Sequence, residues 1–420
     1  MHKGSSAQRV ALLSLHSSPI APLGRSDAGG MNLYVRRLAT GLGEAGMRVD
    51  VFTRRTDGRT PEIMNLGDGV RLINLSAGPR RRLPKHVLPL HLPALSAALR
   101  EFADREQITY DLLHSHYWIS GMAAVRYRVQ AGIDVPCVHM FHTLSKLKEF
   151  YSCGPDPTDS ALRADGERCL MGRVDAVVGG TDSELEDMSR LYGRTPARYV
   201  TIPPGVDLDL FAPLDTSVSR QRIGVRAKRV ILFVGRLDRL KGLDLLLRAT
   251  SQLPPGLLQD LKLLLVGAQE RASGREPRYR KLAERLGLGN VVEFRGKVEQ
   301  SDLPAYYSAA DICAIPSSYE SFGMVAIESM ACQTPPVAFR VGGLATTITS
   351  GRTGILAAHG SAEEFGNALR SALTSSTLEE MGRRGRMSVQ RYTWERTTRS
   401  TLSLYDEMLS DSDYAYRLER

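Results

Sequence analysis

Short apolar runs alternate with longer segments of helical periodicity along almost the whole chain. In the first half, runs of strand length lie at 9–16, 48–53, 70–75, 111–116, 137–142, 176–181 and 199–204. The same rhythm restarts in the second half, with runs at 230–236, 261–267, 291–296, 312–317 and 336–339. Strands that alternate with helices predict parallel sheets covered by helices on both faces. We therefore expect an α/β fold of two Rossmann-like, doubly wound domains that face each other across a cleft.

A segment rich in Pro, Gly and Asp separates the two halves. It reads PPGVDLDLFAPLDTSVS, residues 203–219, and is the best candidate for a connector. We predict a first domain over 1–205, a second over 206–395, and a C-terminal segment, 396–420, that packs back on the first domain as an amphipathic helix. Residues 76–94 carry four prolines and no clear period. We expect an irregular excursion there.

Composition narrows the class of protein. With 42% hydrophobic and 24% charged residues, the chain has enough apolar material for two globular cores. The net charge is +9, but the densest basic run, Arg80-Arg81-Arg82 with Lys85, has no interleaved aromatic residues, so we do not expect nucleic acid as a partner. The apolar run at 9–16 is too short for a signal peptide or a membrane span. We expect a cytoplasmic protein with no membrane span.

The five cysteines form no CxxC pair, which predicts buried thiols in a reducing cytosol instead of a zinc site or a disulfide framework. They are Cys137, Cys153, Cys169, Cys313 and Cys332.

Candidate chemistry begins directly after the first strand of each half. Gly29 and Gly30 open an amphipathic helix, where a ligand could approach the backbone and an anion could bind the helix N-terminus. A plain strand-to-helix turn explains this segment equally well. In the second half, Arg236 and Lys241 follow the first strand, at the edge of a parallel sheet where open α/β folds bind ligands. Two cations there could hold a diphosphate, although solvated surface charge is the simpler alternative.

Two glutamates, Glu320 and Glu328, flank a Ser-Phe-Gly turn that precedes an apolar helical run. Their separation is a little over two helical turns, so we expect both carboxylates to face the same way from the start of one helix and to bind hydroxyl groups. The turn, residues 321–324, could add backbone N–H donors. A hydrolase with paired carboxylates competes with this interpretation, but it does not require the Gly turn or the distant Arg and Lys.

Several segments resemble a known family. VGRLDRLKG (234–242), ICAIPSSYESFGMVAIESMACQTPPVAFRVGGL (312–344) and GRTGIL (351–356) resemble the retaining family-4 glycosyltransferases of GT-B fold, and the resemblance extends over nearly the whole chain. In the first half, LLHSHYWISG (112–121) and FHTLSKLKEF (141–150) are similar to the mycothiol-pathway members, which transfer N-acetylglucosamine from UDP to 1L-myo-inositol 1-phosphate.

The resemblance implies a role for individual residues. The donor set is Gly29, Gly30, Arg236 and Lys241 at the diphosphate, Glu328 at the ribose, and Glu320 with the amides of Phe322, Gly323 and Met324 at the transferred sugar. The catalytic set is Arg236, Lys241, Glu320 and His142, the last beside the sugar. The acceptor set is Lys85, Tyr117, Thr143 and Arg163 at the phosphate, with Asn32 towards the inositol hydroxyls. The resemblance implies retention of anomeric configuration with no cofactor and no metal.

Each role has a simpler alternative: His142 as a core histidine, Tyr117 as packing, Arg163 as a solvated helix residue. Departures from the family pattern also leave the substrates open. Gln333 and Pro336 stand where relatives have Gly and Val beside the donor pocket. SKLKEFY (145–151), with Met140 and Phe141, replaces the usual acceptor-side segment, and GAQERASG (267–274) replaces a Gly-rich one.

Three readings besides the mycothiol-like one therefore remain. The first is an antibiotic-pathway relative that transfers a GDP-activated octose to the thiol of ergothioneine, as in lincosamide biosynthesis. The second is a glycoside hydrolase or phosphorylase, and the third a non-catalytic sugar-nucleotide sensor. We expect a UDP-sugar or GDP-sugar as donor and a small-molecule acceptor, and we leave a homodimer open.

Overall fold

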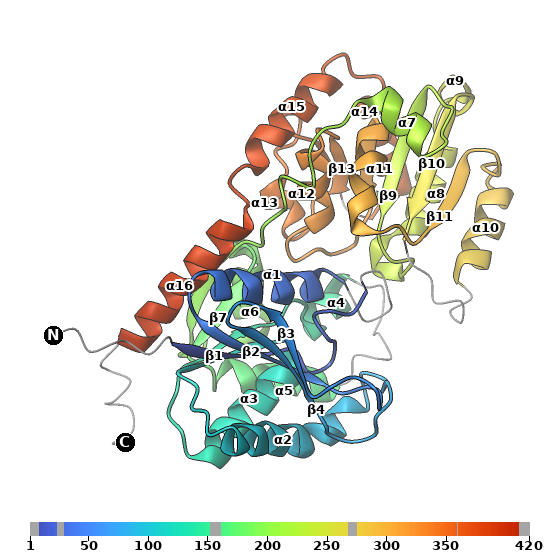
Figure 1. Ribbon diagram of the computed structural model, residues 1–420. Coiled ribbons are helices and arrows are strands. Elements are labelled where there is room, and N and C mark those ends of the chain that lie inside the picture. The colour runs from blue at the N-terminus through green and yellow to red at the C-terminus, as the bar shows by residue number, and fades with distance from the viewer. Residues whose placement is uncertain (1–7, 23–28, 152–160, 268–274, 359, 411–420) are drawn as a thin grey trace. The chain divides into compact units, whose positions relative to one another are not determined.

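The computed structural model describes residues 8–22, 29–151, 161–267, 275–358 and 360–410. Internal contacts divide the chain into two compact units (Figure 1). Unit 1 contains the described parts of Met1–Ala21, Gly30–Pro203 and Trp394–Arg420, and unit 2 those of Pro22–Gly29 and Pro204–Thr393. The chain thus leaves unit 1 after Pro203 and returns to it at Trp394.

Unit 1 is built on a sheet of eight strands in the order β3-β4-β2-β1-β5-β6-β7-β8. All neighbours are parallel except β3 and β4, which are antiparallel. The strands are β1 (Arg9–Leu13), β2 (Arg48–Arg54), β3 (Ile63–Gly67), β4 (Val70–Leu75), β5 (Leu112–His116), β6 (Cys137–Met140), β7 (Ala176–Gly179) and β8 (Arg198–Thr201). All seven predicted runs contain a strand. The edge strand β3 was missed because Asn65 interrupts its three large apolar residues and no side chain in it is buried.

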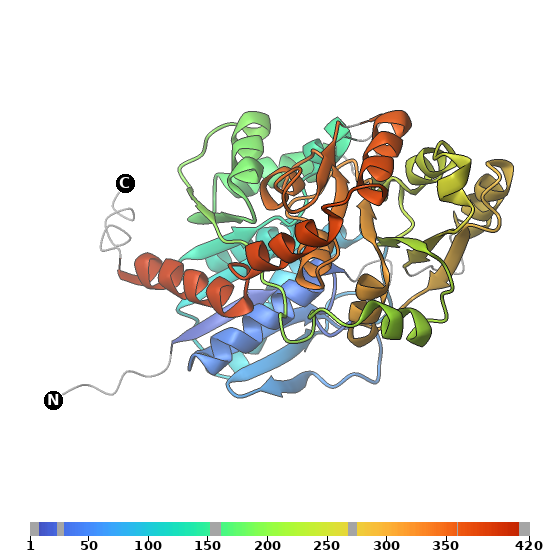
Figure 2. The same ribbon diagram turned by 90° about the horizontal axis from the view of Figure 1, so that it is seen from above.

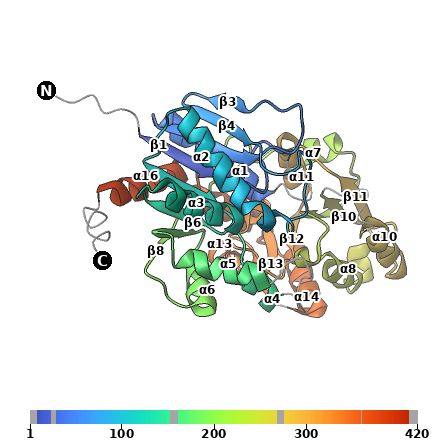
Figure 3. The same ribbon diagram turned by 90° about the horizontal axis from the view of Figure 1, so that it is seen from below.

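Helices cover both faces of this sheet. They are α1 (Gly30–Glu44), α2 (Leu92–Arg105), α3 (Trp118–Ala131), α4 (Ser145–Tyr151), α5 (Ala161–Met171), α6 (Asp182–Tyr192) and α16 (Trp394–Ser410). α1 packs on β2 and β4, with α16 beside it (Figure 2), whereas α3 packs on β1, β5 and β6 together with α2 and α5 (Figure 3). Residues 411–420 of the predicted C-terminal helix lie outside the described residues.

The expectation of an irregular excursion over 76–94 was wrong at its C-terminal end. A short 3-10 helix, η1 (Leu88–His91), leads directly into α2 at Leu92. Pro89 and Pro93 occupy the first turns of these two helices. Proline is accommodated there because the N–H that it lacks would have no partner within the helix. Two of the four prolines therefore start helices instead of breaking them.

Unit 2 contains a six-stranded, all-parallel sheet in the order β11-β10-β9-β12-β13-β14. Its strands are β9 (Arg229–Val234), β10 (Leu261–Val266), β11 (Val292–Gly296), β12 (Ile312–Ile315), β13 (Pro336–Phe339) and β14 (Ile355–Ala357). All five predicted runs contain a strand, and only the three-residue β14 was missed.

Helices also form two layers in unit 2. One layer joins α8 (Leu243–Ser251), α10 (Arg275–Arg285) and α14 (Ala362–Leu373). Opposite it, α11 (Leu303–Ala309) packs with α7 (Thr216–Arg222), and α12 (Met324–Ala331) packs with α15 (Leu378–Val389). Short helices complete the unit: η2 (Arg239–Lys241), α9 (Pro255–Leu258), η3 (Gln300–Asp302) and α13 (Leu344–Thr347).

Each unit encloses its own apolar core. Phe52, Phe102 and Tyr110 are fully buried in unit 1, and Phe233, Tyr307 and Phe365 in unit 2. The thiols of Cys137, Cys313 and Cys332 are buried and not disulfide-bonded, as predicted, while Cys169 is partly exposed and Cys153 lies outside the described residues. Among the helices that the structure describes, none has the length and apolar character that crossing a bilayer demands.

Candidate functional site

Both sheets reverse their winding direction at one point. In unit 1 the chain moves outward from β1 through β2 on one side and from β5 to β8 on the other. In unit 2 the equivalent neighbours are β9 and β12. Open α/β sheets bind ligands at the carboxyl ends of the strands that flank such a switch point. In unit 2 the predicted residues follow β9 and β12, the strands at its switch point. In unit 1 the predicted residues follow β1, β4, β5 and β6, so the switch-point strands β1 and β5 account for only part of the set.

In unit 1, the start of α1 is fastened to the loop after β1. Gly29 immediately precedes α1 and Gly30 is its first residue. The buried Asn32 donates through Nδ2 to Ser17 Oγ at 2.7 Å and to the Ser18 carbonyl oxygen at 2.7 Å. The predicted role of Asn32 towards an acceptor stays a prediction, and its observed role is to hold this loop.

The four residues predicted for an acceptor phosphate come together around one ring. Lys85 Nζ lies 6.0 Å from the centroid of the Tyr117 ring, and Arg163 Cζ lies 5.1 Å from it. Arg163 Nη2 donates to the carbonyl oxygen of Thr143 at 2.7 Å and to its hydroxyl at 3.2 Å. Two cations from distant segments thus face one aromatic residue at the switch point.

Arg163 is not a solvated helix residue, because only 2% of it is exposed. Its Nε donates to Glu167 Oε1 at 2.7 Å, and Glu167 also accepts from the Ser145 amide and the Tyr192 hydroxyl. Burial raises the pKa of Glu167, while Arg163 acts in the opposite direction. The guanidinium is therefore fixed in place by a buried carboxyl and by Thr143.

A second buried arginine, Arg54 at the end of β2, holds the loop that carries Lys85. Its Nη1 donates to the Pro79 carbonyl oxygen at 2.8 Å and its Nη2 to that of Arg81 at 2.6 Å. Only 4% of Arg54 is exposed. A buried cation requires hydrogen-bond partners, and here main-chain oxygens supply them. The basic loop is thereby tied to the sheet close to Lys85.

Backbone strain also marks this region. Tyr117 has φ 71° and ψ 144°, and His142 has φ 60°. Such conformations cost residues other than glycine about 1–3 kcal/mol and are concentrated at functional sites. The Tyr117 amide donates to the Met140 carbonyl oxygen at 2.9 Å, so the strained segment after β5 is bound to the end of β6.

Several buried histidines surround His142. His142 Nε2 lies 3.0 Å from His116 Nδ1, and the Tyr34 ring makes edge contacts with both imidazoles. His114 Nδ1 lies 2.7 Å from the hydroxyl of Tyr405 on α16. Burial lowers the pKa of both His114 and His142 to about 3. These imidazoles are therefore neutral at physiological pH.

Sequence reasoning missed His16, Tyr34 and His116. The His16 ring lies 4.1 Å from the Tyr117 ring, and its pKa is lowered by burial and by the nearby Lys85, His142 and Arg163. His16 and His116 stand where the apolar runs of β1 and β5 end, which are the two strands at the switch point. Their position at the ends of these strands could have identified them as site residues, but only with the strand order known.

In unit 2, the predicted cations follow β9. Arg236 Nη2 pairs with Asp238 Oδ2 at 2.9 Å, and the side chain of Asp238, the N-cap of η2, accepts from the amide of Lys241, the last residue of η2. Lys241 Nζ bonds to Glu320 Oε1, which also accepts from the Ser317 hydroxyl at 2.8 Å. The structure therefore brings Lys241 and Glu320 into direct contact across 79 residues of sequence.

The loop after β12, residues 316–323, is clamped on two sides. Its Ser318 amide donates to the Leu240 carbonyl oxygen at 2.8 Å, and its Glu320 carbonyl oxygen accepts from the Gly343 amide at 2.8 Å. Gly242 has φ 67°, and a Cβ there would lie 2.0 Å from the Pro316 carbonyl oxygen. A residue with a side chain would collide with this carbonyl oxygen, which explains the glycine at the end of VGRLDRLKG.

The expectation that Glu320 and Glu328 share one helix was wrong. α12 begins at Met324 with Gly323 as N-cap, so Glu320 lies in the preceding loop. Glu328 is buried within α12, accepts from the Tyr307 hydroxyl at 2.9 Å, and has a pKa raised to about 7 by burial. Helical spacing was applied to a span whose first residues, 320–323, come before the helix.

The amides of Phe322, Gly323 and Met324 do lie at the N-terminus of α12, where N–H groups have no partner within the helix.

The interpretation of Gln333 and Pro336 as neighbours of a donor pocket was also wrong. Gln333 follows the C-cap of α12 with φ 62°, and the Gln333 and Thr334 amides donate to the carbonyl oxygens of Met330 and Ser329. These bonds form a Schellman motif, in which glycine is the usual residue at this position. Pro336 begins β13, at the opposite end of the sheet from the loop after β12.

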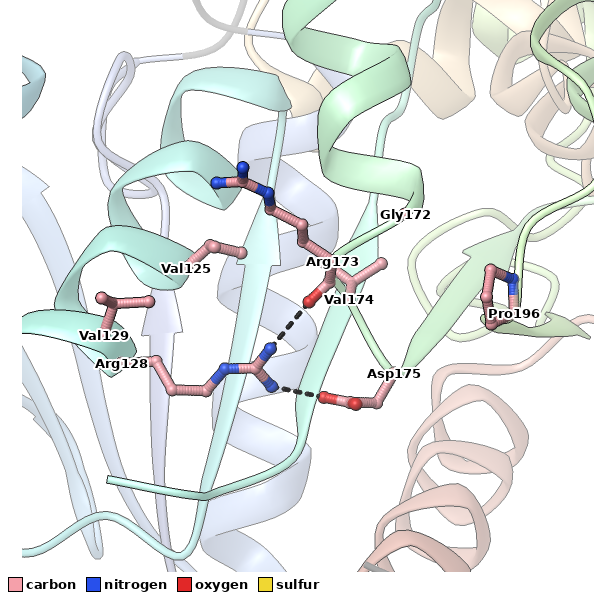
Figure 4. A pocket seen from close by; sticks show the side chains of 8 residues that line it. All are labelled: Val125, Arg128, Val129, Gly172, Arg173, Val174, Asp175 and Pro196. Atoms are coloured by element: carbon pink, nitrogen blue, oxygen red, sulfur yellow. Dashed lines mark hydrogen bonds and ion pairs between the residues drawn. The ribbon is translucent and has the colours of Figure 1, made fainter. Parts of the chain in front are cut away.

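A pocket of about 340 Å³ in unit 1 is unrelated to the predicted residues (Figure 4). Val125 and Arg128 of α3, the segment before β7 and Pro196 line it. Arg128 spans it, donating to Asp175 Oδ2 and to the Arg173 carbonyl oxygen, both at 2.7 Å. Because these residues precede β7 and β8, the pocket lies at the amino edge of the sheet, opposite to the switch point.

Comparison with known proteins identifies the family. The model of the Glycosyl transferase 4-like domain matches residues 29–205, and that of Glycosyl transferases group 1 matches 216–388. The chain is 40% identical over 412 residues to D-inositol 3-phosphate glycosyltransferase 2 of Catenulispora acidiphila, covering 96% of both chains. It is 40% identical over 427 residues to D-inositol 3-phosphate glycosyltransferase of Kineococcus radiotolerans, covering 98% of both.

The fold has a clear counterpart among solved structures. Sucrose-phosphate synthase from Thermosynechococcus elongatus superimposes with a TM-score of 0.88 at 33% identity, over 96% of this chain and all of that one. The expected GT-B architecture and the resemblance to the mycothiol-pathway glycosyltransferases are therefore confirmed. The chain belongs to the family-4 glycosyltransferases of GT-B fold.

Proposed function

We propose that the protein transfers a sugar from a nucleoside diphosphate sugar to a small anionic acceptor, with retention at the anomeric carbon and without a metal. The reaction most like it is transfer from UDP-N-acetylglucosamine to 1L-myo-inositol 1-phosphate. One observation carries this proposal: Lys85 and Arg163 face the Tyr117 ring at the switch point of unit 1. Two cationic donors in one place suit a phosphate group. The curated relatives named above, which act on an inositol phosphate, support the same acceptor class.

On the donor side, the contact between Lys241 and Glu320 suggests an exchange of partners. In the resting protein the ammonium group and the carboxylate neutralise each other. When the donor binds, Lys241 and Arg236 turn to the diphosphate and Glu320 accepts hydrogen bonds from the sugar hydroxyls. The bond from the anomeric carbon to the diphosphate then breaks, and the cations stabilise the charge on the leaving group.

The acceptor oxygen forms its bond on the face that the diphosphate leaves, and its proton passes to a departing phosphate oxygen. Glu328, next to Tyr307, accepts from the ribose hydroxyls. We place the reaction in the cytoplasm, in keeping with the free thiols of the four cysteines in the described part of the chain.

A second candidate is transfer of a GDP-activated sugar to a thiol. The segment SKLKEFY is the reason to keep it, because this departure from the family pattern forms α4 close to Thr143, one of the proposed acceptor residues. Met140 and Phe141 do not favour it, since both side chains are buried in the core.

A thermal-shift panel of UDP, GDP and ADP separates the two candidates on the donor side. A ligand present at 100 times its Kd stabilises the native state by about 2.7 kcal/mol. A shift with UDP alone supports the first candidate, and a shift with GDP alone supports the second. If no nucleotide shifts the melting temperature and no nucleotide sugar supports transfer to any acceptor, the proposed function is wrong.

On the acceptor side, the test is Lys85→Ala. We expect the KM for a phosphorylated acceptor to rise by about tenfold or more with kcat little changed, because a charge-assisted hydrogen bond contributes about 1.5–3 kcal/mol. Arg82→Ala, an exposed arginine on the same loop, serves as the matched control. An equal KM for the parent and Lys85→Ala would exclude a phosphorylated acceptor at this place.

A further inference from the structure

Two histidines meet at the carboxyl edge of the sheet in unit 1. His116 ends β5, and His142 comes two residues after the end of the neighbouring β6. In the register of these strands His116 pairs with Met140, and His142 follows two residues later with a φ of 60°. The result is the 3.0 Å contact between His116 Nδ1 and His142 Nε2.

Only one proton can lie between these two nitrogens. If His142 donated it, His116 would accept at Nδ1 and would carry its own proton on Nε2. His116 is fully buried, and its Nε2 has no hydrogen-bond partner among the described residues. A buried N–H group without an acceptor costs about 1–3 kcal/mol, and orphaned buried donors are rarer than orphaned acceptors. The favourable arrangement therefore has His116 donating from Nδ1, with a bare Nε2.

The surroundings keep His116 neutral and its ring in one orientation. His114, two residues earlier on the same face of β5, stacks on it with ring centroids 4.4 Å apart. Tyr34 makes an edge contact from α1 at 5.8 Å. Burial, followed by the neighbouring His114 and His142, lowers the pKa of His116 well below its ordinary value. A neutral, immobile imidazole has one donor nitrogen and one fixed direction.

From this geometry we propose that His116 is a positioning residue that holds His142 in the tautomer protonated on Nδ1. His142 Nε2 then accepts the hydrogen bond from His116 Nδ1. His142 can donate a hydrogen bond to another group only through its Nδ1–H, and the ring stays neutral. The inference rests on the proposed function in one respect only, the place of His142 beside the transferred sugar. In that place, a fixed neutral donor would orient a sugar hydroxyl without adding a charge.

Three substitutions at His116 test this assignment. His116→Asn places an amide N–H near the position of Nδ1, His116→Gln places it nearer Nε2, and His116→Phe keeps a ring without a donor. With the nucleotide sugar that the parent uses, we expect His116→Asn to retain most of kcat. We expect His116→Gln and His116→Phe to lose about tenfold or more, because a mispositioned hydrogen-bonding group contributes little to the transition state. In a His142→Ala background, His116→Phe should have no further effect.

The decisive readout is the tautomer itself, observed in the full chain labelled with ¹⁵N-histidine. We expect His142 to show the pattern of an Nδ1–H imidazole in the parent and in His116→Asn, and a mixture of tautomers in His116→Phe. An Nε2–H tautomer of His142 in the parent would overturn the proposal. Equal loss of kcat in all three variants at unchanged melting temperature would overturn it as well.

The measurement in the resting protein needs no substrate. If the parent transfers no sugar at all, the proposed function fails while the tautomer assignment is still decided.

Discussion

The buried carboxyl of Glu328 makes the stability of unit 2 depend on pH. Burial raises its pKa from the ordinary value of 4.5 to about 7. The folded state therefore binds this proton more tightly than the unfolded state does. The stabilising contribution is fully present below pH 4.5 and is lost as the pH rises to 7. Since one pKa unit corresponds to 1.36 kcal/mol, unit 2 should lose about 3 kcal/mol of unfolding free energy over this interval.

Glu328→Gln isolates that contribution, because an amide keeps the shape of the side chain but does not titrate. Between pH 4.5 and 7.5, the stability of the variant relative to the parent should increase by about 3 kcal/mol. For a unit of this size, that corresponds to roughly 6–12 °C in melting temperature, which scanning calorimetry resolves. Glu363→Gln, at an exposed position on α14, is the control and should follow the parent. Parallel pH profiles for the parent and Glu328→Gln would refute the reasoning.

The same proton should oppose nucleotide binding. If Glu328 accepts hydrogen bonds from the ribose as a carboxylate, the affinity for UDP or GDP should fall about tenfold for each pH unit below 7. Calorimetric titration at pH 6 and pH 8 measures this ratio. Glu328→Gln should bind more weakly at pH 8 and show no such ratio. A parent whose nucleotide Kd is the same at both values would remove Glu328 from the ribose site.

Three further predictions address other parts of the molecule. Lys241→Ala should lower kcat by about 10²–10³-fold in a transfer assay, whereas Arg239→Ala, an exposed residue of the same short helix, should not; near-normal turnover in Lys241→Ala would refute the assigned role. Gln333→Gly should raise the melting temperature of unit 2 by about 2 °C, because it relieves a left-handed conformation at a helix end, and a decrease would contradict the reading of that motif. Every histidine in the described ranges belongs to unit 1, and burial lowers the pKa values of His114, His116, His139 and His142. Unit 1 should therefore lose stability as the pH falls below 6.5, while unit 2 does not. Calorimetry from pH 7.5 to 5 tests this difference.

The sequence predicted the fold well because its main signal is local. Most central strands hold three or more apolar residues in a short run, and such runs need no knowledge of their neighbours. What was missed lacks that signal: β3 is a half-exposed edge strand, and β14 has only three residues. Prolines misled the prediction over 76–94, because the same residue that breaks a helix interior also starts a helix.

The candidate site was predicted only in part for a different reason. Lys241 and Glu320 could be named from their motifs, but their direct contact depends on β9 and β12 being neighbours, which sequence order does not reveal. His116 could not be distinguished from a core histidine, because the contact that sets it apart is made with His142, which follows the neighbouring strand. Gln333 was placed beside the donor pocket because relatives have glycine there, but that glycine is explained by the left-handed backbone at the end of α12 and not by a ligand.

The way in which Arg54 fastens the basic loop has a consequence for engineering. Its hydrogen bonds end on main-chain oxygens of Pro79 and Arg81, so the fastening ignores which side chains the loop carries. The three consecutive arginines at 80–82 are exposed and can be exchanged for acidic, neutral or aromatic residues while Lys85 keeps its place. A small library at these positions would therefore change the charge of this surface on an unchanged scaffold.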